Sequence, residues 1–162
     1  MAELISVRAA TLDDEAMLTA LAWRLTEFTL PAWRKPEHIA EADANEMMAA
    51  IRKGSAVSEV FVAQYDGEPD GAIAGCLHMV ATVDFFGTAH GHISVIAVTP
   101  EAEGRGVGRA LMEYAEAWTK RRGYALLTLN VFAANARARR FYDRAGYAPE
   151  VMKYSKALKI GE

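Results

Sequence analysis

The stretch VIAVTPEAEGRGVGRALM, residues 95–112, decides the fold of this chain. It passes from an apolar segment, through three closely spaced glycines, into a segment with helical periodicity. Helix N-termini present unpaired N–H groups, and glycines let the backbone approach a ligand closely, so such a turn suits a phosphate group. We therefore predict a strand, an anion-binding loop and a helix within an α/β domain.

The spacing of Gly104, Gly106 and Gly108 separates this loop from two common nucleotide-binding loops. A P-loop requires Gly, four residues and then Gly-Lys-Ser/Thr, and this stretch has no lysine. A Rossmann fingerprint requires Gly-x-Gly-x-x-Gly, whereas the spacing here is Gly-x-Gly-x-Gly. An ordinary strand-to-helix turn is the alternative, but the glycine density and the flanking arginines favour an anion site.

The composition is ordinary for a globular protein. The chain has 162 residues, of which 52% are hydrophobic and 24% charged, so we expect one domain over residues 1–162. The net charge of −3 argues against nucleic acid or an anionic membrane as a partner. No signal peptide or membrane-spanning segment is evident, which predicts a cytoplasmic protein. The single cysteine, Cys76, excludes an intramolecular disulfide and is expected in the core.

Apolar periodicity predicts the element order β-α-α-β-β-β-α-β-α-β. The predicted strands are residues 4–9, 57–65, 72–83, 92–98, 125–131 and 151–158. The predicted helices begin at Thr11 with an apolar stripe that reaches Phe28, and run from Pro36 to Gly54, from Gly106 to Arg121 and from Asn135 to the AGY at 145–147. This order indicates a mixed α/β domain around one sheet.

The stretch NVFAANARARRFYDRAGY, residues 130–147, is the second informative segment. Asn135 is suited to cap the helix, and Phe141 and Tyr142 lie on its apolar face. Most of its arginines are interpreted as a solvated face, because the RARR cluster is short and the chain is acidic overall.

Together, the two stretches resemble the GCN5-related N-acetyltransferase (GNAT) family. Residues 95–112 are similar to that family's acetyl-CoA loop, Arg/Gln-x-x-Gly-x-Gly/Ala, and residues 135–147 to its Asn-x-x-Ala-x-x-Phe-Tyr signature with Gly-Phe/Tyr after it. The segment SVRAATLDDEAML, residues 6–18, also resembles the usual start of the family. The resemblance implies a mixed, mostly antiparallel, twisted sheet of about six to seven strands with about four helices. The strands at 92–98 and 125–131 would splay apart to admit a pantetheine arm.

The resemblance implies acetyl-CoA as co-substrate and transfer of its acetyl group to a primary amine of a small molecule or peptide, by direct attack in a ternary complex. Val98 would stabilise the oxyanion through its backbone N–H, and Tyr142 would be the general acid for the leaving thiolate. The cofactor-binding residues implied are Ile96, Ala97, Val98, Glu103, Gly104, Arg105, Gly106, Val107, Gly108, Arg109, Asn135, Ala138, Phe141 and Tyr142.

A base is also expected, because an amine must be neutral to attack a thioester. Strict alternation along the strand at 92–98 would place His90, His92, Ser94, Ile96 and Val98 on one face. His92 occupies the position at which several members of the family carry a Glu or His base. His90 or a water chain remains an alternative, with Ser94 as a relay. His92 could equally be an exposed strand residue without a catalytic role.

Glu103 departs from the resemblance, because the family has Arg or Gln there. A carboxylate repels a nearby pyrophosphate. The backbone N–H of Glu103 can still contribute, and Arg105 and Arg109 are close in sequence. We therefore expect weaker cofactor binding at worst.

The sequence indicates less about the site that binds the amine acceptor. Residues 27–38 and 83–91 supply Phe28, Trp33, Phe85 and Phe86, with Glu27 and Asp84 as ammonium partners. An apolar pocket with a few acidic groups suits a small amine. The same aromatics could plug the ends of the core or form a dimer contact, so a homodimer stays open. An aminoglycoside, a polyamine, an amino-acid derivative and a protein N-terminus all remain open as acceptors.

No metal site is predicted. Of the four histidines only His90 and His92 are close in sequence, and no cysteine or paired carboxylate completes a ligand set, while His78 is expected to be a satisfied strand residue. The alternative function is a non-catalytic acyl-CoA-binding or regulatory domain, which Glu103 and the missing glutamate base favour and His92 and Tyr142 oppose. A nicotinamide-binding domain would require the glycine spacing that is missing.

Overall fold

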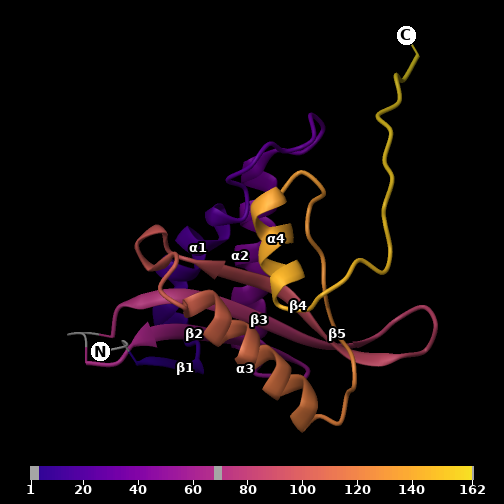
Figure 1. Ribbon diagram of the computed structural model, residues 1–162. Helices are drawn as coiled ribbons and strands as arrows, with labels where there is room; N and C mark the ends of the chain where they lie inside the picture. Colours follow the sequence, from indigo (N-terminus) through magenta and orange to yellow (C-terminus); the bar gives the residue numbers. More distant parts are fainter. Residues whose placement is uncertain (1–3, 68–70, 162) are drawn as a thin grey trace.

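The computed structural model describes residues 4–67 and 71–161. Its elements follow the predicted order as far as the last helix (Figure 1). The strands are β1 (Ile5–Ala9), β2 (Ser58–Tyr65), β3 (Ile73–Val83), β4 (Ala89–Val98) and β5 (Leu127–Leu129). The helices are α1 (Glu15–Arg24), α2 (Pro36–Lys53), α3 (Val107–Arg121) and α4 (Ala136–Arg144), with 3-10 turns η1 (Leu12–Asp14) and η2 (Pro100–Ala102). The predicted mixed α/β class is confirmed.

The strands form one sheet in the order β1-β2-β3-β4-β5. Neighbours from β1 to β4 are antiparallel, and only β4 and β5 are parallel. This is the mixed, mostly antiparallel sheet that the resemblance implies, although the described residues form five strands rather than six or seven.

The strand predicted at 151–158 is absent. The chain beyond α4 has no regular structure and leads away from the sheet, as the yellow end of Figure 1 shows. Its apolar side chains are left in the open, with Met152 69%, Tyr154 86% and Leu158 76% exposed. A strand needs a neighbour that takes up its N–H and C=O groups. The last strand of the sheet, β5, has only three residues and offers a short edge, so the apolar pattern of 151–158 has no paired neighbour.

The first helix also ends earlier than its apolar stripe predicts, at Arg24 rather than near Phe28. The Thr26 hydroxyl donates to the Trp23 carbonyl at 2.8 Å. A side-chain hydroxyl that donates to a backbone carbonyl in this way competes with the backbone N–H that would continue the helix. Residues 25–35 therefore form a loop between α1 and α2.

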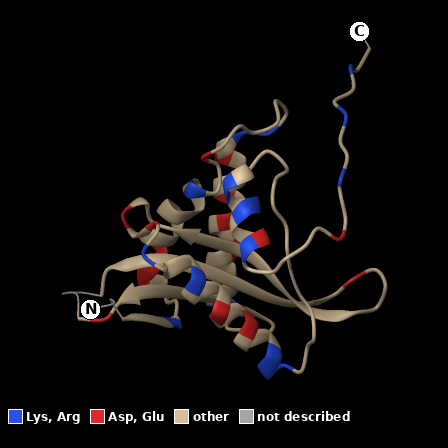
Figure 2. Ribbon diagram, viewed as in Figure 1, with Lys and Arg blue, Asp and Glu red and all other residues tan. Residues whose placement is uncertain are grey.

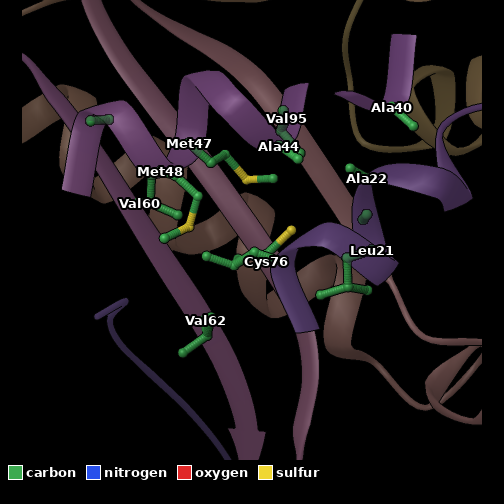
Figure 3. Close-up of a cluster of buried hydrophobic side chains, with 13 residues drawn as sticks. Leu21, Ala22, Ala40, Ala44, Met47, Met48, Val60, Val62, Cys76 and Val95 are labelled. Carbon is green, nitrogen blue, oxygen red and sulfur yellow. The ribbon is translucent and has the colours of Figure 1, made fainter. Parts of the chain in front are cut away.

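Helices cover both faces of the sheet and create two cores. Helices α1 and α2 pack on one face around Leu21, Met47, Val60 and Cys76 (Figure 3). Helix α3 packs on the other face around Leu77, Met79, Leu111 and Trp118. Cys76 is fully buried, which confirms its predicted core position.

Candidate active site

Strands β4 and β5 separate part-way along their length. They pair only where residues 91–93 lie opposite Leu127–Leu129, whereas β4 continues to Val98. Beyond Ile93, no strand in the described part of the chain pairs with the outer edge of β4. This is the expected splay, and its open end lies next to the glycine loop (Figure 1).

The glycine loop leaves the start of α3 open. Gly104 and Gly106 have φ of +72° and +87°, conformations that L-residues rarely adopt. A Cβ on Gly104 would meet nothing within 4 Å, and a Cβ on Gly106 only the tip of Ile5 at 3.9 Å. No side chain caps α3. The first N–H groups of this 15-residue helix are therefore presented without a side-chain competitor, which fits a phosphate group.

Helix α4 closes against the same loop. Asn135 accepts from the Ala138 N–H at 3.2 Å, which confirms the predicted cap. The Phe141 ring lies beside Gly108, where a Cβ would approach its Cζ to 3.4 Å. The small residue at Gly108 therefore permits the close contact between α3 and α4.

Tyr142 is partly buried beside Phe141 and Tyr147, with ring centroids 5.5 and 6.2 Å away. Burial raises the pKa of Tyr142 to about 12. The phenol therefore keeps its proton at neutral pH and is able to donate it.

A bulge in β4 changes the faces that alternation predicted. Ile93 pairs with Met79 and Val95 with His78, so Ser94 is an extra residue on β4. An extra residue reverses the alternation beyond it. Ile93, Ile96 and Val98 consequently pack on the α3 side, while Val95 and Ala97 pack on the α1–α2 side. The prediction that His90, His92, Ile96 and Val98 share one face is wrong for this reason.

His92 faces α2 and is held from β5. Its Nδ1 lies 2.7 Å from the Thr128 hydroxyl, a contact across the parallel pair. Burial lowers the pKa of His92, and the neighbouring His90 lowers it further, while Glu46 of α2 opposes these shifts. The imidazole is therefore neutral at pH 7, which is the form that accepts a proton.

The other two strand histidines are more deeply buried. His90 Nδ1 lies 2.9 Å from the Thr88 carbonyl, so this nitrogen carries the hydrogen. His78 is fully buried and bonds through Nε2 to the Ser58 hydroxyl at 2.9 Å. Its Nδ1 has no partner among the described residues. The prediction that His78 is satisfied thus holds for one nitrogen only.

Helix α2 adds carboxylates on the same side as His92. Asp43 is half-buried, and burial together with Glu46 raises the pKa of Asp43 to about 6. Glu46 interacts electrostatically with both His78 and His92. Asp43 and Glu46 therefore give this face of β4 an acidic surrounding that the sequence analysis did not identify.

The two segments proposed for the acceptor lie apart. The β3–β4 hairpin and the α1–α2 loop occupy different ends of the molecule (Figure 1). Asp84 accepts from the Phe86 and Thr88 N–H groups at 2.9 Å, so its carboxylate caps its own hairpin. Phe85 and Phe86 are 98% and 79% exposed. Phe28 instead contacts Phe132, with ring centroids 5.3 Å apart.

Glu103 lies between two arginines. Arg137, in the first turn of α4, donates to it from Nη1 and Nη2 at 3.0 and 2.7 Å. Arg24 at the end of α1 also pairs with it, and Arg24 pairs with Glu27 as well. Arg137 is the main reason that the pKa of Glu103 is lowered. The sequence does not indicate Arg24 for this site, and it predicts Arg137 on a solvated face.

The arginines expected near the phosphate have other contacts. Arg105 stacks over the Tyr65 ring at 4.3 Å, and Arg109 pairs with Glu113 at 3.0 Å on the exposed side of α3.

Comparison with known proteins identifies the family of the chain. A model of the acetyltransferase (GNAT) family matches residues 19–147. The chain belongs to this family. A 5-NmdU N-acetyltransferase from Pseudomonas phage PaMx11 is 34% identical over 106 residues, 64% of this chain and 67% of that protein.

Other relatives match the chain over a short stretch or at low sequence identity. A mycothiol acetyltransferase from Beutenbergia cavernae is 44% identical over 61 residues, 38% of this chain. The matched part spans only 20% of that relative's length. A solved GCN5-related N-acetyltransferase from Ralstonia eutropha superposes with a TM-score of 0.70 at 21% identity, covering 96% of this chain and 99% of that one. At this identity the superposition shows the shared fold.

Within residues 4–67 and 71–161, no helix is long and apolar enough to cross a membrane. The same residues contain no group of three or more His, Cys, Asp or Glu side chains placed to hold a metal ion.

Proposed function

We propose that the protein is an acetyl-CoA-dependent N-acetyltransferase that acts on a primary amine of a small molecule or peptide. The observation that carries the proposal is the splay between β4 and β5, which opens at the bulge beside His92 and ends at the glycine-lined start of α3. A long, thin thioester with an anionic end fits a cleft of this form. The residues around it supply a base, an acid and backbone N–H donors.

Bound acetyl-CoA would supply the activated acetyl group. The N–H groups of residues 104–109 would hold its pyrophosphate, because they combine left-handed glycines with an uncapped helix start. The backbone of residues 96–98 would pair with the pantetheine arm as a strand pairs with its neighbour. Asn135, Ala138 and Phe141 would line the α4 side.

His92 would accept a proton from the ammonium group of the acceptor, so that the neutral amine can attack the thioester. The Thr128 hydroxyl can accept from Nδ1–H and thereby leave Nε2 free. Glu46 would stabilise the imidazolium as it forms, since the two groups attract. Asp43 and Glu46 would also draw a cationic amine towards this face. His90 or a water chain would remain as the base if His92 proved dispensable.

The oxyanion donor must lie close to the base. A strand rises about 3.3 Å per residue, so even with one residue taken up by the bulge Val98 lies roughly 17 Å from His92, and the two cannot act on one carbonyl. We therefore assign Val98 to the pantetheine arm and place the oxyanion donor at the bulge, in the backbone of Ser94 or Val95. Tyr142 would donate its proton to the leaving thiolate.

The test is a coupled assay for released thiol with acetyl-CoA and a panel of amines. We expect CoA release with at least one amine and its loss, by roughly 10²-fold or more, in Tyr142→Phe. Tyr154→Phe is the matched control, because Tyr154 lies exposed on the C-terminal segment. Tight acetyl-CoA binding without turnover across the panel would instead support the non-catalytic acyl-CoA-binding domain.

A further inference from the structure

Glu103 is the residue of the phosphate loop whose side chain has no role in the proposed function. Its carboxylate lies one residue before Gly104 and accepts both Arg137 nitrogens, at 3.0 and 2.7 Å. It also pairs with Arg24, which reaches the loop from the end of α1. One carboxylate therefore joins two guanidinium groups from different helices, and both of them reach its Oε1.

The three side chains span the mouth of the cleft. Arg24 donates from Nε to the Val98 carbonyl at 3.1 Å, at the last residue of β4. Arg137 lies in the first turn of α4, directly after the Asn135 cap. The group thus extends from the end of the splay, past the start of the glycine loop, to the N-terminus of α4.

The surroundings of Glu103 favour an anion. The first turns of α3 and α4 contain no acidic residue, so no carboxylate there balances the positive ends of the two helix dipoles. Figure 2 shows basic positions along α4 above this loop. Arg137 adds a positive charge where the α4 dipole is already positive. Glu103 supplies the negative charge that this place requires.

We propose that the Glu103 carboxylate takes the position of a cofactor phosphate before CoA binds, and that CoA binding exchanges it for that phosphate. Arg24 and Arg137 are then cofactor-binding residues, and Glu103 is an internal competitor for them. This inference rests on the proposed function, because it concerns the anionic end of the same cofactor. The exchange also accounts for a carboxylate at a position where the family has a cation or amide. In this chain the positive charge for the phosphate would come from Arg24 of α1 and Arg137 of α4.

If this exchange occurs, substitution of the two partners of the ion pair should change the affinity for CoA in opposite directions. Glu103→Gln keeps the side-chain shape but removes the one carboxylate that is paired with Arg137 among the described residues. Arg24 keeps its ion pair with Glu27 and its bond to the Val98 carbonyl. CoA should therefore bind about tenfold more tightly at low ionic strength, chiefly through Arg137. Arg137→Gln removes a phosphate ligand, so CoA should bind about tenfold more weakly. A role in stability alone would move both affinities in the same direction, because both substitutions break the same pair.

The experiment is calorimetric titration of each variant with CoA, without acetyl group or acceptor. Glu101→Gln controls for charge, since Glu101 is exposed two residues earlier and has no ion pair among the described residues. Arg144→Gln is the control for Arg137→Gln, because it lies at the far end of α4. We expect tighter binding only in Glu103→Gln and weaker binding only in Arg137→Gln. Thermal melts of every variant verify folding.

A second ligand separates the phosphate end from the rest of the cofactor. Pantetheine lacks the phosphates, so its affinity should not differ between wild type and Glu103→Gln. Equal CoA affinity in Glu103→Gln and Glu101→Gln, or weaker binding in both Glu103→Gln and Arg137→Gln, overturns the exchange and leaves the enzyme intact. Wild-type protein that binds neither CoA nor acetyl-CoA overturns the proposed function and this inference with it.

Discussion

The pKa and the hydrogen bonding of His92 depend on residues from other elements that surround it. Its position before the glycine loop made it a candidate base, but its chemistry depends on Thr128, on His90 and on Glu46 of α2. These groups come from three different parts of the chain. The bulge at Ser94 then turns His92 and Val98 to opposite faces. Individual residue roles in this site therefore follow from the local backbone as much as from residue type.

His92 should control the acidic side of the rate profile. A base works in its deprotonated form, and burial lowers the pKa of His92 from its ordinary value. Wild-type kcat/KM should therefore rise with pH through this lowered pKa and continue to rise as the amine itself loses its proton. His92→Gln should lower kcat by roughly 10²-fold and abolish the lower rise. Profiles measured from pH 5 to 9 check this, and an unchanged profile in the variant would assign the base to His90 or water.

At the scale of elements, close approaches decide where helices lie against the sheet. Gly91 in β4 faces Thr119 of α3, and Gly108 in α3 faces Phe141 of α4. Both glycines are sites where a side chain would separate two elements. The proposed site needs this closeness, because α3 and α4 lie together beside the glycine loop.

Gly91→Ala should be destabilising. Its Cβ would lie 3.0 Å from Thr119 Cγ2, and closer still to the Thr119 hydroxyl. Overpacking of this kind costs about 1–3 kcal/mol of the free energy of unfolding. Thr119→Ala in the same chain should restore part of that loss, since it removes both crowded atoms. Denaturant titrations of the single and double variants measure the effect; additive losses would show that the two residues do not meet.

Gly106→Glu should abolish acetyl-CoA binding. The residue caps α3 with φ of +87° and lies at the proposed phosphate position. Gly106→Ala is the matched control, because it carries the same backbone strain of about 1 kcal/mol without the charge. We expect acetyl-CoA to bind roughly 10²-fold more weakly to Gly106→Glu than to Gly106→Ala, from the added charge. Equal affinities by calorimetry would place the phosphate elsewhere.

On the scale of the whole molecule, the residues after Tyr147 lie outside the packed fold. Two cores on either side of the sheet hold the described elements together. The segment after Tyr147 contributes to neither core and stays exposed along its length. The stability of the molecule should therefore reside in the residues up to Tyr147.

Removal of residues 148–162 should leave the melting temperature unchanged to within about 1 °C, because exposed residues away from packed contacts contribute little to stability. Calorimetric scans of the full and shortened chains test this. A loss of several degrees would mean that residues 151–158 do pair as a strand, as their apolar pattern predicts.

The sequence by itself determined the mixed α/β class, the glycine loop at the start of α3, the Asn135 cap and the buried position of Cys76. These features are local: they follow from periodicity, glycine spacing and capping chemistry within a few residues. The family resemblance rests on the same local patterns and correctly implied the splay between β4 and β5.

Only the tertiary structure decided the rest. The bulge at Ser94 follows from how β4 pairs with β3, and the ion pairs of Glu103 join residues 79 and 34 positions apart. The acidic surrounding of His92 depends on how α2 packs over β4. The missing last strand has the same cause, since pairing needs a partner that the apolar pattern of 151–158 does not specify. Long-range pairing and packing carry no periodic signal, and they place the charges that this cleft presents to its ligands.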